Sequence, residues 1–241
     1  MKFEDIRRLQ QKKFREEAGW YLLEGEHLVQ ELQKAAVREP KLRTSEIYVT
    51  GEHARWCSQL TVHVVTTRQM EQISETRTPQ GIVAVAPMLP PPAPQPGERA
   101  IYLHEIQDPG NLGTILRTLA WFGKFRCLLG PGSVDVYNGK VVRASMGAIF
   151  HVPVETDVSL ESLPARFPRI ASLDLQGESI ATTAFHQFDC YLFGNEARGL
   201  PRERVAALGA SPFAIRGTGA MESLNVAAAV TATQYELARG G

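Results

Sequence analysis

The sequence lacks a hydrophobic run of the length that crosses a membrane. No stretch among its 241 residues approaches the roughly 18 consecutive apolar residues that a membrane-spanning helix needs. The N-terminal stretch MKFEDIRRLQQKKF also lacks the apolar segment of a secretory signal peptide. We therefore expect a protein that is neither exported nor inserted in a membrane, and that acts in the cytoplasm.

Cysteine is scarce, with Cys57, Cys127 and Cys190 the only three in the chain. These residues are far apart, their number is odd, and their spacings match no pattern of metal ligands. We therefore expect neither a disulfide framework nor a zinc site. The sequence predicts no metal centre, and free thiols fit a reducing compartment.

The sequence has no excess of charge of either sign, because 26 basic residues balance 26 acidic ones. This balance disfavours a protein coated with positive charge that binds nucleic acid indiscriminately, but a local basic patch is enough to hold phosphates. Such a patch occurs near the N-terminus, at Arg7, Arg8, Lys12, Lys13 and Arg15. Charge alone leaves two interpretations open, an RNA-binding surface or the solvated face of a charged helix.

A proline-rich segment interrupts the chain. Residues 87–96 hold six prolines in ten positions. Proline fixes φ and removes a hydrogen-bond donor, so this segment favours neither a helix nor a central strand and predicts an extended linker. We accordingly expect a first domain at residues 1–87, a linker at residues 88–98 and a second domain at residues 99–241.

Hydrophobic patterns differ on the two sides of the linker. The first domain has helical patterns at residues 3–18 and 24–36 and strand patterns at residues 46–50, 61–65 and 81–85. The second has apolar strand patterns at residues 100–103, 126–129, 150–154, 170–173, 190–193 and 213–215, with its clearest helices at residues 110–122 and 223–239. The first pattern predicts a small α/β domain, and the second predicts a parallel sheet covered on both faces. Because such sheets bind ligands at the carboxyl ends of their strands, we expect the chemistry there.

Polar residues and glycines gather after three of the predicted strands. They are Asn111 and Arg117 in the first segment, Gly194, Glu196 and Gly199 in the second, and Ser223 and Asn225 in the third. In the first segment, Asp108 and Pro109 favour the start of a helix. In the third, a glycine-bearing loop leads from Ile215 into the last helix. Each segment by itself is also compatible with helix capping, an exposed arginine or turn chemistry.

Together and in this order, the three segments resemble the motifs of the SpoU (TrmH-like) family of knotted SPOUT methyltransferases. The motifs are matched by Asn111 and Arg117, by Gly194, Glu196 and Gly199, and by Ser223, Leu224, Asn225 and Val226. Residues 143–148 are similar to a helix between the first two motifs of the family. The N-terminal part, with Phe14 and Arg15, Gly19, residues 23–25 and residues 79–81, resembles the ribosomal-protein-L30e-like RNA-binding domain that often precedes this catalytic domain. The resemblance therefore covers nearly the whole chain.

The resemblance implies an S-adenosylmethionine-dependent enzyme that methylates a ribose 2′-hydroxyl of RNA. It implies a parallel-sheet α/β catalytic domain with a trefoil knot near its C-terminus, preceded by a small L30e-like α/β domain. It also implies a homodimer with its active sites at the subunit interface. The L30e-like domain favours ribosomal over transfer RNA as the substrate.

The resemblance also assigns roles to individual residues. It implies a cofactor cleft in which backbone groups hold the adenine, at Gly194, Ile215 and Leu224. The apolar walls of this cleft are expected at Leu173 and Phe193. Arg117 is expected to hold the phosphate beside the target ribose, because a guanidinium binds phosphate bidentately. The residues expected to orient Arg117, the hydroxyl and the loops are Asn111, Glu196, Ser223 and Asn225.

Two adjacent positions depart from the family pattern, because Arg216 and Gly217 stand where the family usually has Pro-Met. This departure supports one alternative, a non-catalytic RNA-binding protein that retains the fold. A knotted enzyme that methylates a base nitrogen is a second alternative. An ordinary Rossmann methyltransferase is disfavoured, because no Gly-x-Gly loop follows the first strand of the catalytic domain.

Overall fold

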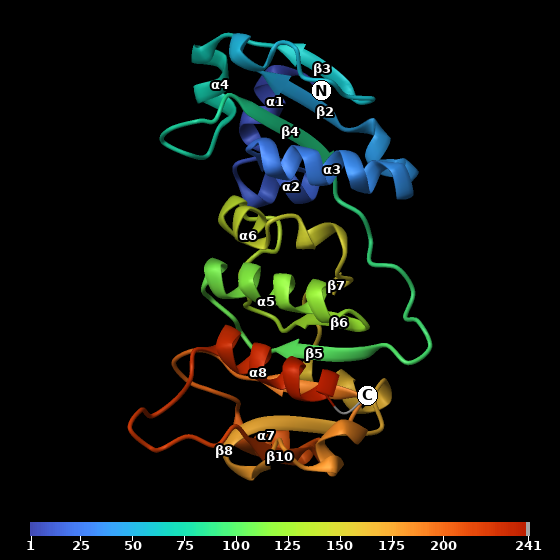
Figure 1. Cartoon of the computed structure of the whole chain (residues 1–241), viewed down its shortest axis with the longest axis vertical. Helices are drawn as coiled ribbons and strands as arrows, with labels where there is room; N and C mark the ends of the chain where they lie inside the picture. Colours follow the sequence, from blue (N-terminus) through green and yellow to red (C-terminus); the bar gives the residue numbers. More distant parts are fainter. Residues whose placement is uncertain (240–241) are drawn as a thin grey trace. The chain divides into compact units, whose positions relative to one another are not determined.

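The computed structural model describes residues 1–239, which form two compact units (Figure 1). The first unit consists of Met1–Pro90 together with Asp135–Phe150, and the second of Pro91–Val134 together with the chain from His151 onward. The chain therefore leaves the second unit, contributes sixteen residues to the first and returns. Those sixteen residues lie within the sequence that we expected to form the catalytic domain alone.

The first unit contains a four-stranded mixed sheet in the order β1-β4-β2-β3. β1 and β2 are antiparallel to β4, and β3 is parallel to β2. The strands are β1 (Trp20–Glu24), β2 (Glu46–Val49), β3 (Thr61–Val64) and β4 (Ile82–Pro87). The helices are α1 (Phe3–Arg8), α2 (Lys12–Ala18), α3 (Glu26–Arg38), α4 (Thr67–Ile73) and α6 (Gly139–Ser145), with short 3-10 turns at Pro40–Thr44, Gly51–His53 and Ala148–Phe150.

Two predicted helices of this unit are wrong in their extent. The helix expected over residues 3–18 is two helices, and the second ends at Gly19, whose φ of 73° is left-handed. The helix expected over residues 24–36 begins at Glu26, because the preceding residues form β1. Four of the five β1 residues are buried, so the strand shows no alternation by which the sequence could reveal it.

Both faces of this sheet are covered by apolar packing. Tyr21 and Leu23 of β1 face a cluster that includes the buried side of α3, while Leu22 between them faces a cluster with α1 and α4. Val142 of α6 is fully buried in the first of these clusters. Residues 135–150 are therefore part of the hydrophobic core of the first unit.

The second unit contains a six-stranded sheet, and all its strand pairs are parallel, in the order β10-β8-β9-β5-β6-β7. The strands are β5 (Arg99–Leu103), β6 (Phe125–Leu129), β7 (Val154–Glu155), β8 (Ile170–Ser179), β9 (Cys190–Phe193) and β10 (Ser211–Ala214). The helices are α5 (Pro109–Phe122), α7 (Arg202–Ala207) and α8 (Val226–Arg239), with 3-10 turns at Leu160–Ala165 and Thr183–Gln187. The predicted α/β architecture with a parallel sheet is confirmed. The strand expected over residues 150–154 is wrong, because only Val154 and Glu155 pair with β6.

The helices α5 and α8 lie side by side (Figure 1). The Asp108 side chain caps the start of α5 by accepting a hydrogen bond from the Asn111 backbone N–H at 2.7 Å, and Pro109 occupies the first turn. The apolar side of α5, with Leu112 and Leu116 among others, is fully buried. This burial leaves Asn111 at the first turn of the helix and Arg117 on its exposed side.

An irregularity in the pairing of β8 with β10 shapes the carboxyl end of the sheet. Pro212 pairs with Ser172, but the next residue, Phe213, pairs with Glu178. Residues 173–177 therefore leave the register and form a bulge. Gly177 closes the bulge so tightly that a Cβ built on it would lie 2.3 Å from the Phe213 nitrogen. The sequence pattern predicted only the first four residues of β8, at residues 170–173.

Candidate active site

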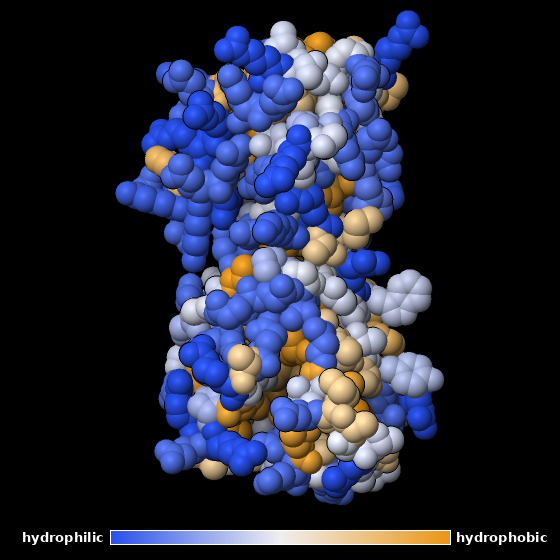
Figure 2. Space-filling view, turned by 90° about the vertical axis from the view of Figure 1, so that its left-hand side faces the viewer, coloured by the Kyte–Doolittle hydropathy of each residue, from blue (hydrophilic) through white to orange (hydrophobic). Residues whose placement is uncertain are grey.

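A cavity of about 570 Å³ opens at the carboxyl ends of β8, β9 and β10. Three segments line it: residues 173–175 of the bulge, residues between 193 and 202 from the end of β9 onward, and residues between 213 and 229 from the end of β10 to the first turn of α8. The face of the second unit drawn in Figure 2 shows apolar side chains gathered around a hollow and bordered by polar ones. A cavity of this size and mixed polarity suits a small organic ligand.

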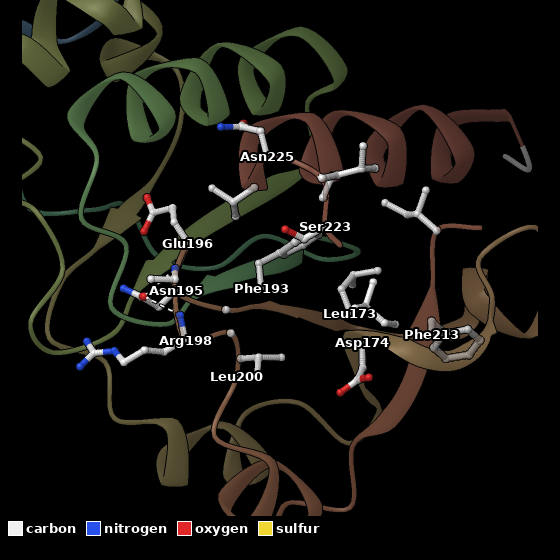
Figure 3. Close-up of a pocket in the computed structure, with 18 of the residues that line it drawn as sticks. Leu173, Asp174, Phe193, Asn195, Glu196, Arg198, Leu200, Phe213, Ser223 and Asn225 are labelled. Carbon is white, nitrogen blue, oxygen red and sulfur yellow. Dashed lines mark hydrogen bonds between the residues drawn. The ribbon is translucent and has the colours of Figure 1, made fainter. Parts of the chain in front are cut away.

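All five residues expected to hold the cofactor line this cavity, namely Leu173, Phe193, Gly194, Ile215 and Leu224. They come from the ends of three different strands and from the loop before α8, and Figure 3 shows how the labelled ones surround the same space. Whether these residues bind the cofactor stays a prediction. The structure nevertheless brings together positions that are up to 51 residues apart in the sequence.

The glycine at the end of β9 allows two stretches of backbone to approach closely. A Cβ built on Gly194 would lie 2.2 Å from the carbonyl carbon of Gly199 and 2.4 Å from the Leu200 nitrogen. The Asn195 and Gly199 backbones exchange two hydrogen bonds, and Gly199 has a left-handed φ of 67°. The loop after β9 therefore folds back on itself, and any side chain at Gly194 would push it apart.

The side chain of Asn195 stabilises this loop, and we did not single it out from the sequence. Its amide donates to the Glu105 carbonyl oxygen at 2.7 Å, while its Oδ1 accepts from the Ala197 and Arg198 backbone nitrogens at 3.0 and 3.1 Å. Arg198 in turn pairs with the Glu105 carboxylate at 2.5 Å. The available signal was local, because asparagine typically binds backbone groups two and three residues ahead in a tight turn.

A hydrogen-bond network joins the three motif segments. Glu196 accepts hydrogen bonds from the backbone nitrogens of Gln107 and Asp108 and from the Asn111 side-chain amide, each at 3.2 Å. Asn111 Oδ1 accepts from the Asn225 side-chain amide at 2.9 Å. The structure thus places the middle loop against the start of α5, and the start of α5 against the start of α8.

Asn225 also caps α8, because its Oδ1 accepts from the Ala227 and Ala228 backbone nitrogens at 2.9 and 3.3 Å. We expected α8 to begin at Ser223, but Ser223 and Leu224 lie in the exposed loop before the helix and line the cavity. Figure 3 shows Glu196 and Asn225 toward one side of this space and Asp174 toward the other. Asp174 forms an ion pair with Arg202 at 3.6 Å, and we did not predict either residue for this site.

Arg117 does not line the cavity. It lies six residues after Asn111 on α5, which is about 9 Å along the helix axis, and its side chain is exposed. Among residues 1–239 it has no hydrogen-bond or ion-pair partner within the chain. Its guanidinium is therefore available to a ligand outside the chain, and its catalytic role stays a prediction.

The basic residues of the N-terminal patch do not share one environment. Arg7, Arg8, Lys12 and Lys13 are exposed, but Arg15 is only 3% exposed. The Arg15 guanidinium donates to the carbonyl oxygens of residues 9 and 10 at 2.8 and 3.0 Å, and it pairs with the carboxylate of Asp135. The expectation that Arg15 contacts RNA is therefore corrected, because its donors hold the turn after α1 to a segment 120 residues away.

Burial dominates the titration of His104, which follows β5 at the edge of the site. It lowers the pKa of the His104 imidazole, and the neighbouring Glu105 carboxylate opposes this shift. The His104 side chain is 9% exposed, with Nε2 at 3.7 Å from the Glu105 carboxylate.

Within the part of the chain that the structure describes, no group of three His, Cys, Asp or Glu residues is arranged to hold a metal ion.

Comparison with known proteins identifies the family of this chain. The profile of the SpoU rRNA methylase family matches residues 98–235, and that of an MRM3-like substrate-binding domain matches residues 2–84. The first of these stretches contains the three motifs, and the second contains most of the N-terminal part of the first unit. The chain belongs to the SpoU rRNA methylase family.

Several relatives of this SpoU-family chain have names or structures. It is 31% identical to the 23S rRNA (guanosine(2553)-2′-O)-methyltransferase RlmP of Bacillus subtilis, over 98% of this chain and 95% of that protein. A solved structure of a TrmH-family protein from Porphyromonas gingivalis matches with a TM-score of 0.85 and 31% identity, over 99% of this chain and 97% of that one. The AdoMet-bound rRNA methyltransferase of Sinorhizobium meliloti matches with a TM-score of 0.79 and 28% identity, over 98% and 94%.

Proposed function

We propose that this protein transfers a methyl group from S-adenosylmethionine to a ribose 2′-hydroxyl of ribosomal RNA. The observation that carries the proposal is the joining of the three motifs, in which Glu196, Asn111 and Asn225 bind one another beside the cavity. The Bacillus subtilis relative, matched over nearly its full length, is named as a 2′-O-methyltransferase of 23S rRNA. A structural relative matched over 94% of its chain is described as an AdoMet-bound rRNA methyltransferase.

The cavity has the features that S-adenosylmethionine requires. Phe193, Phe213 and Leu173 offer apolar surface for the adenine ring. The backbone of Gly194 carries no side chain that would separate it from a ligand, and the backbone of residues 215 and 224 borders the same space. Carboxylates at Glu196 and Asp174 border it on two sides, so polar parts of the ligand also meet charged groups. The cofactor supplies a methyl group activated by a positively charged sulfur.

The protein's own residues position the hydroxyl that accepts this methyl group. Arg117 holds the phosphate next to the target ribose through its planar pair of donors, which fixes the ribose relative to the cavity. A guanidinium is a poor proton acceptor, so its contribution is orientation and charge rather than ordinary base catalysis. Asn111, Glu196 and Asn225 hold α5, which carries Arg117, against the two loops that line the cavity. Ser223 lies at the rim of the cavity and contributes a hydroxyl there.

We further propose that the first unit binds the RNA. The four exposed basic residues of α1 and α2, Arg7, Arg8, Lys12 and Lys13, supply phosphate contacts. The match of residues 2–84 to a family described as substrate-binding supports this assignment.

No helix within residues 1–239 is both long and apolar enough to cross a membrane. A cytoplasmic location stays a prediction from the sequence.

We also propose that two copies of the chain associate through α5 and α8. Trp121 on α5 and Tyr235 on α8 are 85% and 59% exposed, which is a large aromatic surface for an unpaired face. The two helices pack against each other, and Thr118 and Thr231 are joined at 3.0 Å. The trefoil knot near the C-terminus is likewise a proposal, which rests on the family resemblance.

The experiment that tests the function is methylation of ribosomal RNA by the purified protein with isotope-labelled S-adenosylmethionine. The RNA, extracted from a strain in which this gene is deleted, is digested to nucleosides and analysed by mass spectrometry. Label on a ribose oxygen supports the proposal, and label on a base nitrogen supports the knotted base methyltransferase instead. A parallel reaction with transfer RNA separates the two substrate classes. Cofactor binding without any transfer, or RNA binding without cofactor binding, would contradict the proposed activity.

A further inference from the structure

Arg216 links two of the segments that form the cavity. Its Nη2 donates a hydrogen bond to the Gly177 carbonyl oxygen at 2.9 Å. Gly177 closes the bulge that carries Leu173 and Asp174 into the cavity, and Arg216 begins the loop that carries Ser223 and Leu224 into it. A single side chain therefore connects the wall formed by β8 with the wall formed by the loop before α8.

The acceptor of this bond is held rigidly. Gly177 approaches the Phe213 backbone so closely that no Cβ fits between them, and the Ile180 backbone N–H donates to the Ala214 carbonyl oxygen at 3.1 Å just beyond. The Gly177 carbonyl is thus fixed relative to the end of β10. The loop that starts with Arg216 has no comparable support, because every residue from 216 to 225 is exposed.

The far end of this loop is fastened by a different residue. Asn225 caps α8 and donates to Asn111, so it fixes the point where the loop enters the helix. Within the loop, the one hydrogen bond among described residues is from the Ala220 backbone N–H to Thr218 Oγ1, at 3.4 Å. The positions of Ser223 and Leu224 therefore depend on how the two ends of the loop are held.

We propose that Arg216 is a positioning residue for the cofactor, which sets the separation of the two cavity walls by holding the start of the loop to Gly177. This proposal rests on the proposed cofactor site.

The test compares two substitutions at this position by isothermal titration of the full-length protein with S-adenosylmethionine. Arg216→Met keeps an unbranched side chain of moderate length but removes the donor. It should weaken cofactor affinity roughly three- to ten-fold, the factor that one hydrogen bond of ordinary net strength supplies. Arg216→Lys keeps a hydrogen-bond donor at the end of an unbranched side chain, so its affinity should stay within about two-fold of wild type. Both variants should melt at the wild-type temperature, since the exposed side chain contributes no core packing.

The control is Arg169→Ala, which removes another exposed arginine of the same unit. Arg169 pairs with Asp189 at 3.0 Å, and neither residue lines the cavity. It should leave cofactor affinity unchanged. Wild-type affinity in Arg216→Met, or equal losses in the Met and Lys variants, would overturn the proposal. So would a lower melting temperature in Arg216→Met with unchanged affinity. Cofactor binding by the wild-type protein reports separately on the site itself.

Discussion

Replacing Arg117 with alanine tests its role in catalysis separately from any effect on stability. The side chain is exposed and has no partner within residues 1–239, so its removal breaks no interaction of the folded chain. Its loss should therefore change the free energy of unfolding by less than about 0.5 kcal/mol. Cofactor affinity should also be unchanged, because Arg117 is not among the residues that line the cavity.

Turnover should respond very differently. If Arg117 holds the phosphate as the transition state forms, alanine removes one preorganised electrostatic contact. Loss of such a contact lowers turnover about 10²-fold or more, which corresponds to roughly 2.7–4 kcal/mol. Arg117→Lys should recover little of this loss, because an ammonium is a point charge and lacks the planar pair of donors that matches a phosphate.

The assay is single-turnover methyl transfer to ribosomal RNA at saturating cofactor, with the melting temperature measured on the same preparations. Arg169→Ala is the matched control, since it also removes an exposed arginine of the second unit. A folded Arg117→Ala protein that transfers methyl groups at the wild-type rate would refute the catalytic role of Arg117. Equal rates for the alanine and lysine variants, both low, would agree with a requirement for the guanidinium fork.

Three further changes test other parts of the site. Gly194→Ala should abolish most cofactor binding and lower the free energy of unfolding by about 1–3 kcal/mol, because the alanine Cβ would overlap the Gly199 carbonyl carbon. Calorimetry and thermal melting check this, and a variant that binds and melts like wild type would contradict it. Glu196→Gln should weaken cofactor affinity by about 1 kcal/mol, because the glutamine amide nitrogen would face N–H donors that now bind the Glu196 carboxylate. Unchanged affinity on titration would argue against a role of this network in shaping the cavity. At pH 8 a thiol reagent should label the exposed Cys57 alone, because burial raises the pKa of Cys127 to about 12 and also raises the pKa of Cys190. Mass spectrometry of the labelled, folded protein shows whether a second thiol reacts.

The sequence predicted the elements of the site best where a local pattern decides them. The strand over residues 190–193 has the predicted bounds, because it is a short apolar run between an aspartate and a glycine. The start of α5 was also predictable, since Asp108 and Pro109 are capping signals that act within one turn. The predicted cofactor residues fall around one cavity because they lie near the ends of strands or in the loop that follows one, and parallel strands end at the same edge of the sheet.

Interactions between distant residues were not predictable in this way. Arg15 looked like a member of a basic surface patch, because its burial depends on Asp135, which lies 120 residues further along. The bulge in β8 was missed for a similar reason, since it is defined by a jump in pairing with β10 rather than by its own residues. The effect of a side chain at Gly194 was also beyond the sequence. A bulky residue there would displace the loop itself and would not simply fill the cofactor cavity.

The position of residues 135–150 decides how the two units can be studied separately. The proline-rich linker suggests a cut near residue 97, which would yield a catalytic fragment without the first unit. That cut would remove the packing partners of Val142, which is fully buried. It would also remove Tyr21, whose ring centroid lies 4.7 Å from that of Tyr137. Exposing such side chains costs about 1.5–3 kcal/mol each, so the fragment would carry a destabilised segment with solvent-exposed apolar side chains. Asp135 would also lose Arg15.

The contribution of the first unit to RNA binding is therefore better measured in the intact protein. Changing Arg7, Arg8, Lys12 and Lys13 to alanine leaves the core untouched, because all four side chains are exposed. If they contact phosphates, RNA affinity should fall, and the slope of log affinity against log salt should lose roughly 0.7–0.9 for each contact removed. Arg15 is left in place, since its loss would weaken the attachment of residues 135–150. An unchanged salt slope in a variant that still binds cofactor would mean that the four residues form only the solvated face of two charged helices.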